Sequence, residues 1–398
     1  MENEEQKNDN REVVQVKAGT STRVVAAASV KAEEVPTLPL GPLQTISELQ
    51  PEVTVHAVTS TRAVRLPAPL VEQPTEYHRS VSDWMQIWWD GIRPSYLTLS
   101  LVPLFVGSML AWIETITSRT PLGHFNLATF LGATVVVLFL QVGGQLINDY
   151  YDYMRGIDRS NLLGPGGLIQ QGLVKPTRVL MVGMTMLALG SLLGLVVAFS
   201  GGVVVYLFGL VGLLSAYLYS ATSRALSSLA LGELVAFLVF GPLITLGAYM
   251  VQMGSISRAA FIYSIPLGLL AAATVHVNNI RDMEGDAQSG KLTIASMLGM
   301  QWSRAWFMVL IVGAYVIVTV LGVSHAAPHW LLITLWTLPM LAVIVSGVLR
   351  TDNPAGFHLV MQQLLRLEVV FAVLLVVGLL IAALIPSLPH LPAHLLPV

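Results

Sequence analysis

The sequence contains no cysteine and very little charge. None of its 398 residues is Cys, and only 11% are Asp, Glu, Lys or Arg, whereas 54% are hydrophobic. Without cysteine there is no disulfide, no thiolate metal ligand and no thiol nucleophile. Soluble domains carry about 25% charged residues, so this composition predicts a protein that lies mostly inside a membrane.

The first 80 residues lack the hydrophobic periodicity of a packed domain. Residues 1–12 are polar and acidic, so we expect no cleavable secretory signal there. Residues 1–80 mix proline with Ser, Thr, Glu and Val, which predicts a disordered N-terminal extension. Residues 81–95 then place Trp84, Trp88 and Trp89 largely on one side of a predicted helix. This pattern is typical of an amphipathic helix at a membrane interface.

Nine apolar runs of about 20 residues each, the length that spans a bilayer, follow within residues 96–390. They lie at 96–113, 126–147, 178–199, 202–221, 229–250, 259–279, 304–324, 330–349 and 368–388. We therefore expect an all-α, polytopic membrane protein whose nine transmembrane helices form a bundle around a central cavity.

Basic residues are distributed unevenly between the two sides of this predicted bundle. The even-numbered loops hold most of them, whereas the odd-numbered loops carry only Arg119 and Arg258. The positive-inside rule then places the N-terminus and the even-numbered loops in the cytoplasm. We expect a multi-pass protein of the cell (plasma) membrane, with its cavity open on the cytoplasmic side.

Two acidic clusters begin where apolar runs end, at residues 148–152 and 278–286. Carboxylates at a membrane rim need a reason. Asp149 and Asp152 are three residues apart, and Asp282 and Asp286 are four apart, so on a helix each pair shares one face. Such a face repels itself unless a cation binds, which favours a hard divalent ion such as Mg²⁺.

Together the clusters predict a diphosphate site. Two helix ends of this kind, facing each other, would hold about two Mg²⁺ ions bridged by a diphosphate. Arg281, Lys291 and Arg155 are the expected cationic partners of the phosphate oxygens. If the carbon chain is allylic, departure of the diphosphate leaves a carbocation, which an apolar chamber protects from water until an aromatic nucleophile attacks.

Other polar residues near the clusters have two interpretations each. Glu233, inside the fifth run, is either a functional carboxylate or a structural hydrogen-bonding group. His276 is either a catalytic base or a structural interior histidine. Tyr217 and Tyr219 either stack on substrate or lie at the interface as anchoring aromatics. Asn279, next to Asn278, is a further candidate for binding substrate.

These motifs resemble those of the UbiA superfamily of intramembrane prenyltransferases. Residues 148–158 read NDYYDYMRGID and residues 278–295 read NNIRDMEGDAQSGKLTIA. Three further stretches are most similar to the 1,4-dihydroxy-2-naphthoate polyprenyltransferases of menaquinone synthesis, namely Arg93-Pro94, residues 167–172 and LGELVAFLVFGP at 231–242. Residues 161–166 lack the Arg-rich stretch usual in the 4-hydroxybenzoate branch, which argues against that acceptor.

The resemblance implies Mg²⁺-dependent transfer of a polyprenyl group from its diphosphate to 1,4-dihydroxy-2-naphthoate, with loss of the ring carboxylate, giving demethylmenaquinone. It implies that four catalytic carboxylates hold Mg²⁺ and diphosphate, with two asparagines supporting them: Asp149, Asp152, Asp282 and Asp286, with Asn148 and Asn278. Arg281 and Lys291 would stabilise the leaving group. Asp158 would either assist the metal or deprotonate the aromatic acceptor.

Other functions compete with this hypothesis. The acceptor could be another quinone precursor, such as homogentisate or 4-hydroxybenzoate, or a non-aromatic glycerol lipid. A protein of a different class, a cation-coupled secondary transporter, would place its coupling residues near the bilayer midplane on broken helices. Here the carboxylates lie at the rim and the apolar runs read as largely uninterrupted, which favours an enzyme. The expected partners are the lipid bilayer and the two substrates, and no nucleic acid.

Overall fold

The computed structural model describes residues 79–118, 123–157, 167–324 and 326–385, together with four short strands nearer the N-terminus. The chain divides into two compact units, Met1–Arg79 and Ser80–Val398. In the first unit, β1 (Val14–Ala18) pairs with β2 (Ser21–Val25), and β3 (Glu52–Val55) with β4 (Val64–Pro67), both antiparallel. Almost all the rest of the predicted disordered extension lies outside the described residues.

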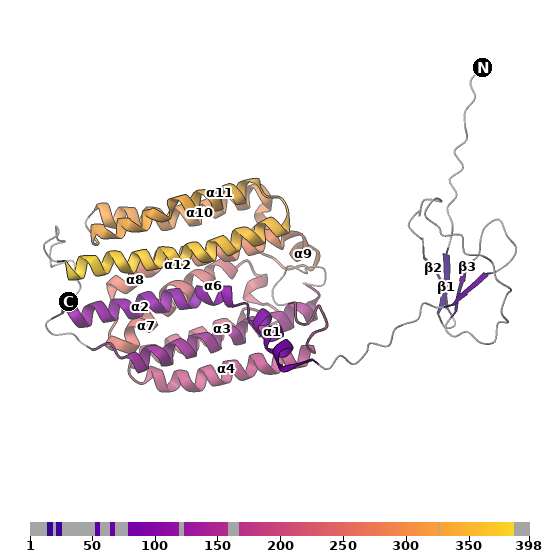
Figure 1. Ribbon diagram of the computed structural model, residues 1–398, viewed down its shortest axis with the longest axis horizontal. Coiled ribbons are helices and arrows are strands. Elements are labelled where there is room, and N and C mark those ends of the chain that lie inside the picture. The colour runs from indigo at the N-terminus through magenta and orange to yellow at the C-terminus, as the bar shows by residue number, and fades with distance from the viewer. Residues whose placement is uncertain are drawn as a thin grey trace, which may run out of the picture. The chain divides into compact units, whose positions relative to one another are not determined.

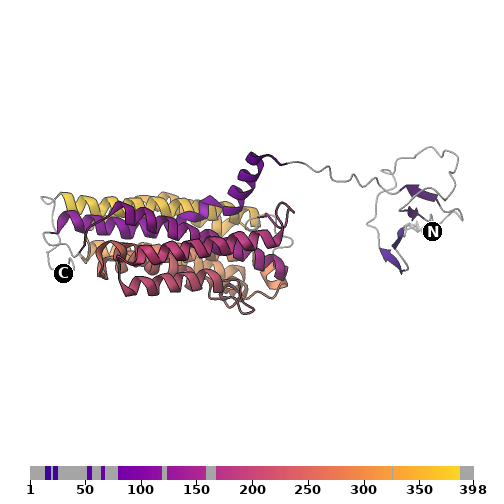
Figure 2. The same cartoon turned by 90° about the horizontal axis from the view of Figure 1, so that it is seen from below.

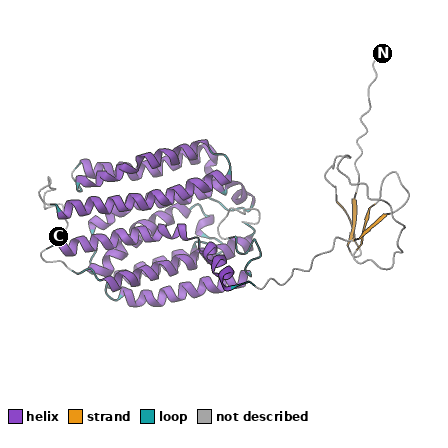
Figure 3. Cartoon of the chain, in the orientation of Figure 1, coloured by secondary structure: helices purple, strands orange, loops and turns teal. Residues whose placement is uncertain are grey.

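The described part of the second unit is built from helices (Figures 1 and 3). Its α-helices are α1 (Val81–Ile92), α2 (Thr98–Thr117), α3 (Leu127–Arg155), α4 (Pro176–Ala198), α5 (Val203–Leu218), α6 (Gly232–Leu238), α7 (Ile244–Met253), α8 (Arg258–Arg281), α9 (Met283–Gln288), α10 (Ile294–Val323), α11 (Leu338–Arg350) and α12 (Pro354–Leu384). Shorter helical segments are η3 (Pro94–Leu97), η4 (Leu226–Ser228), η5 (Val239–Leu243) and η6 (His329–Thr337). The long helices run side by side along the bundle (Figure 2).

Within the described residues, eight helical segments are long and apolar enough to cross a membrane. They span 94–117, 127–155, 176–198, 232–253, 258–281, 294–323, 329–350 and 354–384. The fourth predicted run corresponds to α5, an apolar helix of only 16 residues. The all-α membrane bundle is confirmed, and eight of the nine predicted spans are long enough to cross a bilayer. The remaining one, α5, is shorter than the roughly 20 residues that a bilayer core requires.

Two of the nine predicted runs, the fifth and the eighth, are less regular than their sequences predict, and a third helix, α10, is kinked near its start. The fifth consists of α6, the π-helical η5 and α7, with Pro242 inside η5. Helix α10 contains Gly299 with φ 71° and ψ 171°, ahead of the seventh predicted run at 304–324, and the eighth run begins with the 3₁₀ segment η6. Proline removes a backbone donor, and π turns absorb such a gap. The prediction of largely uninterrupted spans was wrong for the fifth and eighth runs.

Helix α8 occupies the centre of the bundle. In its most apolar window 72% of residues are buried, against 22% in α3 and α4. It packs against α6, η5, α10 and α12. Small residues allow this close approach, because a Cβ built on Gly241 would lie 2.8 Å from the Cα of Gly268. The second acidic cluster follows directly from this helix, so its position is fixed by the bundle's best-packed element.

Replacing Gly268 with alanine should destabilise the bundle. The new Cβ would lie 2.6 Å from the Phe237 carbonyl oxygen, and overpacking of this kind costs about 1–3 kcal/mol. Thermal unfolding of the purified protein in detergent measures the loss. Gly209→Ala is the matched control, since its Cβ would meet no atom within 4 Å. Equal unfolding temperatures for the two variants would show that the approach of α6 to α8 does not constrain the fold.

Candidate active site

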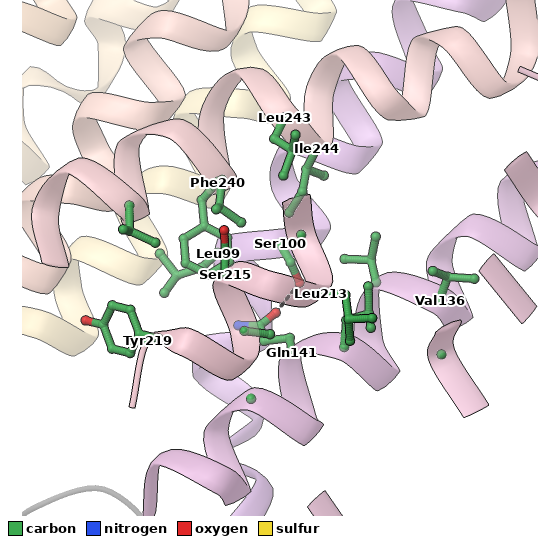
Figure 4. A pocket seen from close by; sticks show the side chains of 18 of the residues that line it. Leu99, Ser100, Val136, Gln141, Leu213, Ser215, Tyr219, Phe240, Leu243 and Ile244 are labelled. Carbon is green, nitrogen blue, oxygen red and sulfur yellow. Dashed lines mark hydrogen bonds between the residues drawn. The ribbon is translucent and has the colours of Figure 1, made fainter. Parts of the chain in front are cut away.

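A cavity of about 510 Å³ lies among α2, α3, α4, α5, α6, α7, η5 and α8. Most of its wall is apolar, as Figure 4 shows for Leu99, Val136, Leu213, Phe240, Leu243 and Ile244. Polar side chains on the wall tend to satisfy one another, for example Ser100, which donates a hydrogen bond to Gln141 Oε1. The chamber suits a hydrocarbon chain and excludes water from most of its length.

One end of this cavity is polar. It is lined there by Arg93, Asn148, Asp152, Asn278, Asp282 and Lys291. The C-terminal end of α3 and the helix α9 lie at the same end of the bundle (Figure 1). The two acidic clusters, 130 residues apart in sequence, therefore meet at the mouth of one apolar chamber.

The first cluster occupies the last two turns of α3. Asp149 is only 2% exposed and forms an ion pair with the Arg93 guanidinium. Asn148 Nδ2 donates to Asp152 Oδ2 at 3.0 Å and to Ser220 Oγ at 2.5 Å. The helix continues through Arg155, so both carboxylates lie on a rigid helix and not in a loop.

The second cluster lies across the junction of α8 and α9. Arg281 donates to both carboxylate oxygens of Asp282, at 2.8 and 2.6 Å, and to Asn278 Oδ1 at 3.0 Å. The backbone N–H of Asp286 donates to the carbonyl of Asp282 at 2.8 Å, so one helical turn separates the two carboxylates despite the break. The bidentate pairing with Arg281 holds Asp282 in one orientation.

Lys291 joins the two clusters. Its Nζ lies 3.3 Å from Asp286 Oδ1, and its charge also interacts with that of Asp152 in the first cluster. Burial acts to lower the pKa of Lys291, but the carboxylates of Asp152 and Asp286 raise it overall, so this ammonium stays charged. Burial raises the pKa of Asp286 to about 6, although Lys291 opposes that shift.

The donor atoms fit a hard divalent cation. One carboxylate oxygen of each of Asp149, Asp152 and Asp286 is buried and accepts no hydrogen bond. Oxygen ligands of this kind suit Mg²⁺, which is usually held by one or two carboxylates plus substrate phosphate. No three His, Cys, Asp or Glu side chains in the described ranges gather around a single point.

The remaining predicted residues differ in whether they line the cavity. Arg155 donates to the backbone carbonyls of Ser220 and Thr222, the latter at 2.7 Å, and its charge lies over the Tyr151 ring. Asn279 lines the cavity, whereas Glu233 lies behind it. Tyr219, and not Tyr217, lines the wall. Asp158 lies outside the described residues.

Arg93 is the site residue that sequence reasoning did not assign to catalysis. It ends α1 with a positive φ of 53°, immediately before Pro94, and this turn directs its side chain to Asp149. The available signal was a basic residue preceding proline at the start of a span. Such a pattern does not name the carboxylate that the cation will reach, because that partner comes from a different helix.

The sequence pattern of the UbiA prenyltransferase family matches residues 100–367. The chain belongs to this family. It is 30% identical over 297 residues to 1,4-dihydroxy-2-naphthoate octaprenyltransferase from Bacillus subtilis (strain 168), which covers 75% of this chain and 93% of that one. The UbiA prenyltransferase domain-containing protein 1 of Mus musculus is 30% identical over 303 residues, covering 75% and 85%. The predicted resemblance is confirmed, and the protein is a prenyltransferase with several membrane-spanning helices.

Solved structures of similar proteins include a UbiA homolog from Archaeoglobus fulgidus bound to GPP and Mg²⁺. That chain is 16% identical, with a TM-score of 0.47, and the match covers 72% of this chain and 99% of that one. A digeranylgeranylglyceryl phosphate synthase matches with a TM-score of 0.48 and 18% identity, covering 74% and 98%.

The stability of the metal-free protein should fall as pH rises through about 6. The pKa of Asp286 is higher in the folded protein than the ordinary 3.8, so protonated Asp286 favours the folded state. This stabilisation is fully present below pH 3.8 and is lost as pH rises through about 6. Asp286→Asn removes this titration. With EDTA present, the unfolding temperature of the variant should decline less than that of the unsubstituted protein between pH 4 and 7. Parallel curves would contradict the shift.

Proposed function

We propose that this protein transfers a polyprenyl group from polyprenyl diphosphate to 1,4-dihydroxy-2-naphthoate, in a Mg²⁺-dependent reaction that yields demethylmenaquinone. The observation that carries the proposal is the apolar cavity whose polar end joins both acidic clusters through Lys291. Relatives from Bacillus subtilis, Haemophilus influenzae and Escherichia coli, all named 1,4-dihydroxy-2-naphthoate octaprenyltransferase, support this acceptor.

The donor would bind with its diphosphate at the polar end and its chain in the apolar chamber. Asp149, Asp152, Asp282 and Asp286 would hold Mg²⁺, with Asn148 and Asn278 orienting Asp152 and Asp282 through their side-chain amides. Bound Mg²⁺ would neutralise the diphosphate and so improve it as a leaving group. Lys291 and Arg93, which line the same end, would donate to the phosphate oxygens.

The chain's contribution to the chemical step is to position charge and exclude water. Cleavage of the C–O bond of an allylic diphosphate leaves an allylic cation, and the carboxylates and the apolar wall stabilise and shelter it. The electron-rich ring carbon of the acceptor attacks it, and the ring carboxylate then leaves as CO₂. Arg281, committed to Asp282 and Asn278, would act by holding the second cluster in place. Asp158 remains the sequence-predicted base or metal assistant.

We also propose that the polar end faces the cytoplasm of a cell bounded by the plasma membrane. Arg281, Lys291 and Arg155 lie at this end, and Arg304 of α10 pairs with Asp352 in the turn between α11 and α12. This distribution agrees with the positive-inside rule. Helix α1 would then lie at the cytoplasmic interface. Its Trp84 and Trp88 pack on the bundle, whereas Trp89 is 63% exposed and would anchor the helix in the headgroup region.

Purified protein supplied with a polyprenyl diphosphate, Mg²⁺ and the naphthoate should form a prenylated, decarboxylated naphthoquinol, detectable by mass spectrometry and lost with EDTA. Asp149→Asn and Asp282→Asn should each lower the rate by about 10²-fold or more, since each removes a ligand charge that the transition state requires. Asp352→Asn is the matched control, because Asp352 is 83% exposed at the same end of the bundle.

The outcomes separate the parts of the proposal. Full activity in either site variant would contradict the metal assignment. Prenylation of homogentisate or 4-hydroxybenzoate, with none of the naphthoate, would preserve the prenyl transfer and change the acceptor. Unfolding temperatures of the variants, measured alongside, show that a lost rate does not reflect lost folded protein.

A further inference from the structure

A buried polar network lies directly behind the cavity wall. Glu233 of α6 and His276 of α8 are 3% and 0% exposed, and Glu233 Oε1 lies 2.9 Å from His276 Nδ1. The same oxygen accepts a hydrogen bond from Asn279 Nδ2 at 3.0 Å. His276 Nε2 lies 3.0 Å from the backbone carbonyl of Ser303 in α10. Glu233 and His276 do not line the cavity, but Asn279 does.

The hydrogen bonds fix how many protons the Glu233 and His276 side chains carry together. A backbone carbonyl only accepts, so His276 Nε2 must carry its hydrogen. One further proton must lie between His276 Nδ1 and Glu233 Oε1, bonded either to the nitrogen or to the oxygen. In either arrangement the pair has no net charge, which allows it to be buried among apolar helices.

This pair determines the orientation of the Asn279 amide. Glu233 accepts from the amide nitrogen, so that nitrogen is held against α6. Among the described residues nothing donates to the amide oxygen of Asn279, and this residue forms part of the cavity wall. A fixed amide therefore presents a hydrogen-bond acceptor to whatever occupies the chamber.

Tyr219 places a donor on the same stretch of wall. A Cβ built on Gly232 would lie 3.2 Å from the Tyr219 hydroxyl and 3.9 Å from Asn279 Nδ2, so Gly232 allows both groups to share this position. Tyr219 also lines the cavity (Figure 4). An amide oxygen and a phenol hydroxyl from two residues that line one cavity together match a ligand group that donates one hydrogen bond and accepts another. A ring hydroxyl is such a group.

We propose that Asn279 and Tyr219 bind a ring hydroxyl of the aromatic acceptor, and that Glu233 with His276 is a positioning pair that holds the Asn279 oxygen toward it. The inference rests on the proposed function, since it requires a phenolic acceptor in this cavity. It gives Glu233 and His276 a role that involves no contact with substrate. Their effect on the reaction passes through the orientation of one amide.

The test is a double-mutant cycle of Glu233→Gln and Asn279→Ala. A glutamine cannot carry the shared proton, so it leaves either His276 or Asn279 without its partner. Glu233→Gln should raise the KM for 1,4-dihydroxy-2-naphthoate by about tenfold, the usual effect of one misplaced hydrogen bond, with the donor KM unchanged. In the Asn279→Ala background the same substitution should add nothing, because the two residues act as a unit.

A second readout compares two acceptors. The unsubstituted protein should prefer the naphthoate over its 4-O-methyl ether, which cannot donate to Asn279, and Glu233→Gln and Asn279→Ala should reduce that preference. Tyr219→Phe leaves the buried network intact and should also raise the acceptor KM, so the inference stays testable if Glu233→Gln fails to fold. Glu114→Gln, which alters a carboxyl hydrogen-bonded to Tyr249 away from the cavity lining, is the matched control and should change neither KM.

The results separate failure of this inference from failure of the proposed function. Additive effects in the cycle, equal changes in both KM values, an unaltered acceptor preference in Glu233→Gln and Asn279→Ala, or an unchanged acceptor KM in Tyr219→Phe would overturn the inference while the unsubstituted protein remains active. If the unsubstituted protein does not prenylate the naphthoate at all, the proposed function fails and this inference fails with it.

Discussion

The site depends on keeping several carboxylates ionisable where the membrane removes most of their water. A buried carboxylate is costly unless a cation or hydrogen bonds compensate for its lost hydration. Here the compensation comes from different helices. Arg93 follows α1 and pairs with Asp149, and Arg281 ends α8 and pairs with Asp282. Lys291 follows α9, and its charge interacts with carboxylates of both clusters. The helix ends that deliver these cations are therefore constrained as strongly as the acidic motifs themselves.

Periodicity and spacing predicted much of this architecture. The nine apolar runs, the helix at residue 81 and the pairing of the acidic residues within each motif follow from hydrophobic length and helical geometry, which are local properties. The irregular spans could not be predicted in the same way. The π segment η5 and the 3₁₀ segment η6 leave the hydropathy of their runs unchanged, because composition does not record which backbone bonds are shifted.

The site shows the same division between local and long-range information. The sequence indicated Asp149, Asp282 and Lys291, since charged residues in apolar surroundings are conspicuous. It did not indicate that Arg93 would pair with Asp149, nor that Glu233 would face Asn279 and not the cavity. Those facts depend on the rotation of one helix against another, which a single sequence does not encode in any short pattern.

The shortness of α5 has a consequence for the lipid around the protein. A helix of 16 residues rises about 24 Å, whereas the hydrocarbon core of a bilayer is about 30 Å thick. Lipids beside α5 must therefore compress, or the flanking turns must sink below the headgroups. Because α5 forms part of the cavity wall, this thinning of the bilayer would lie directly beside the chamber.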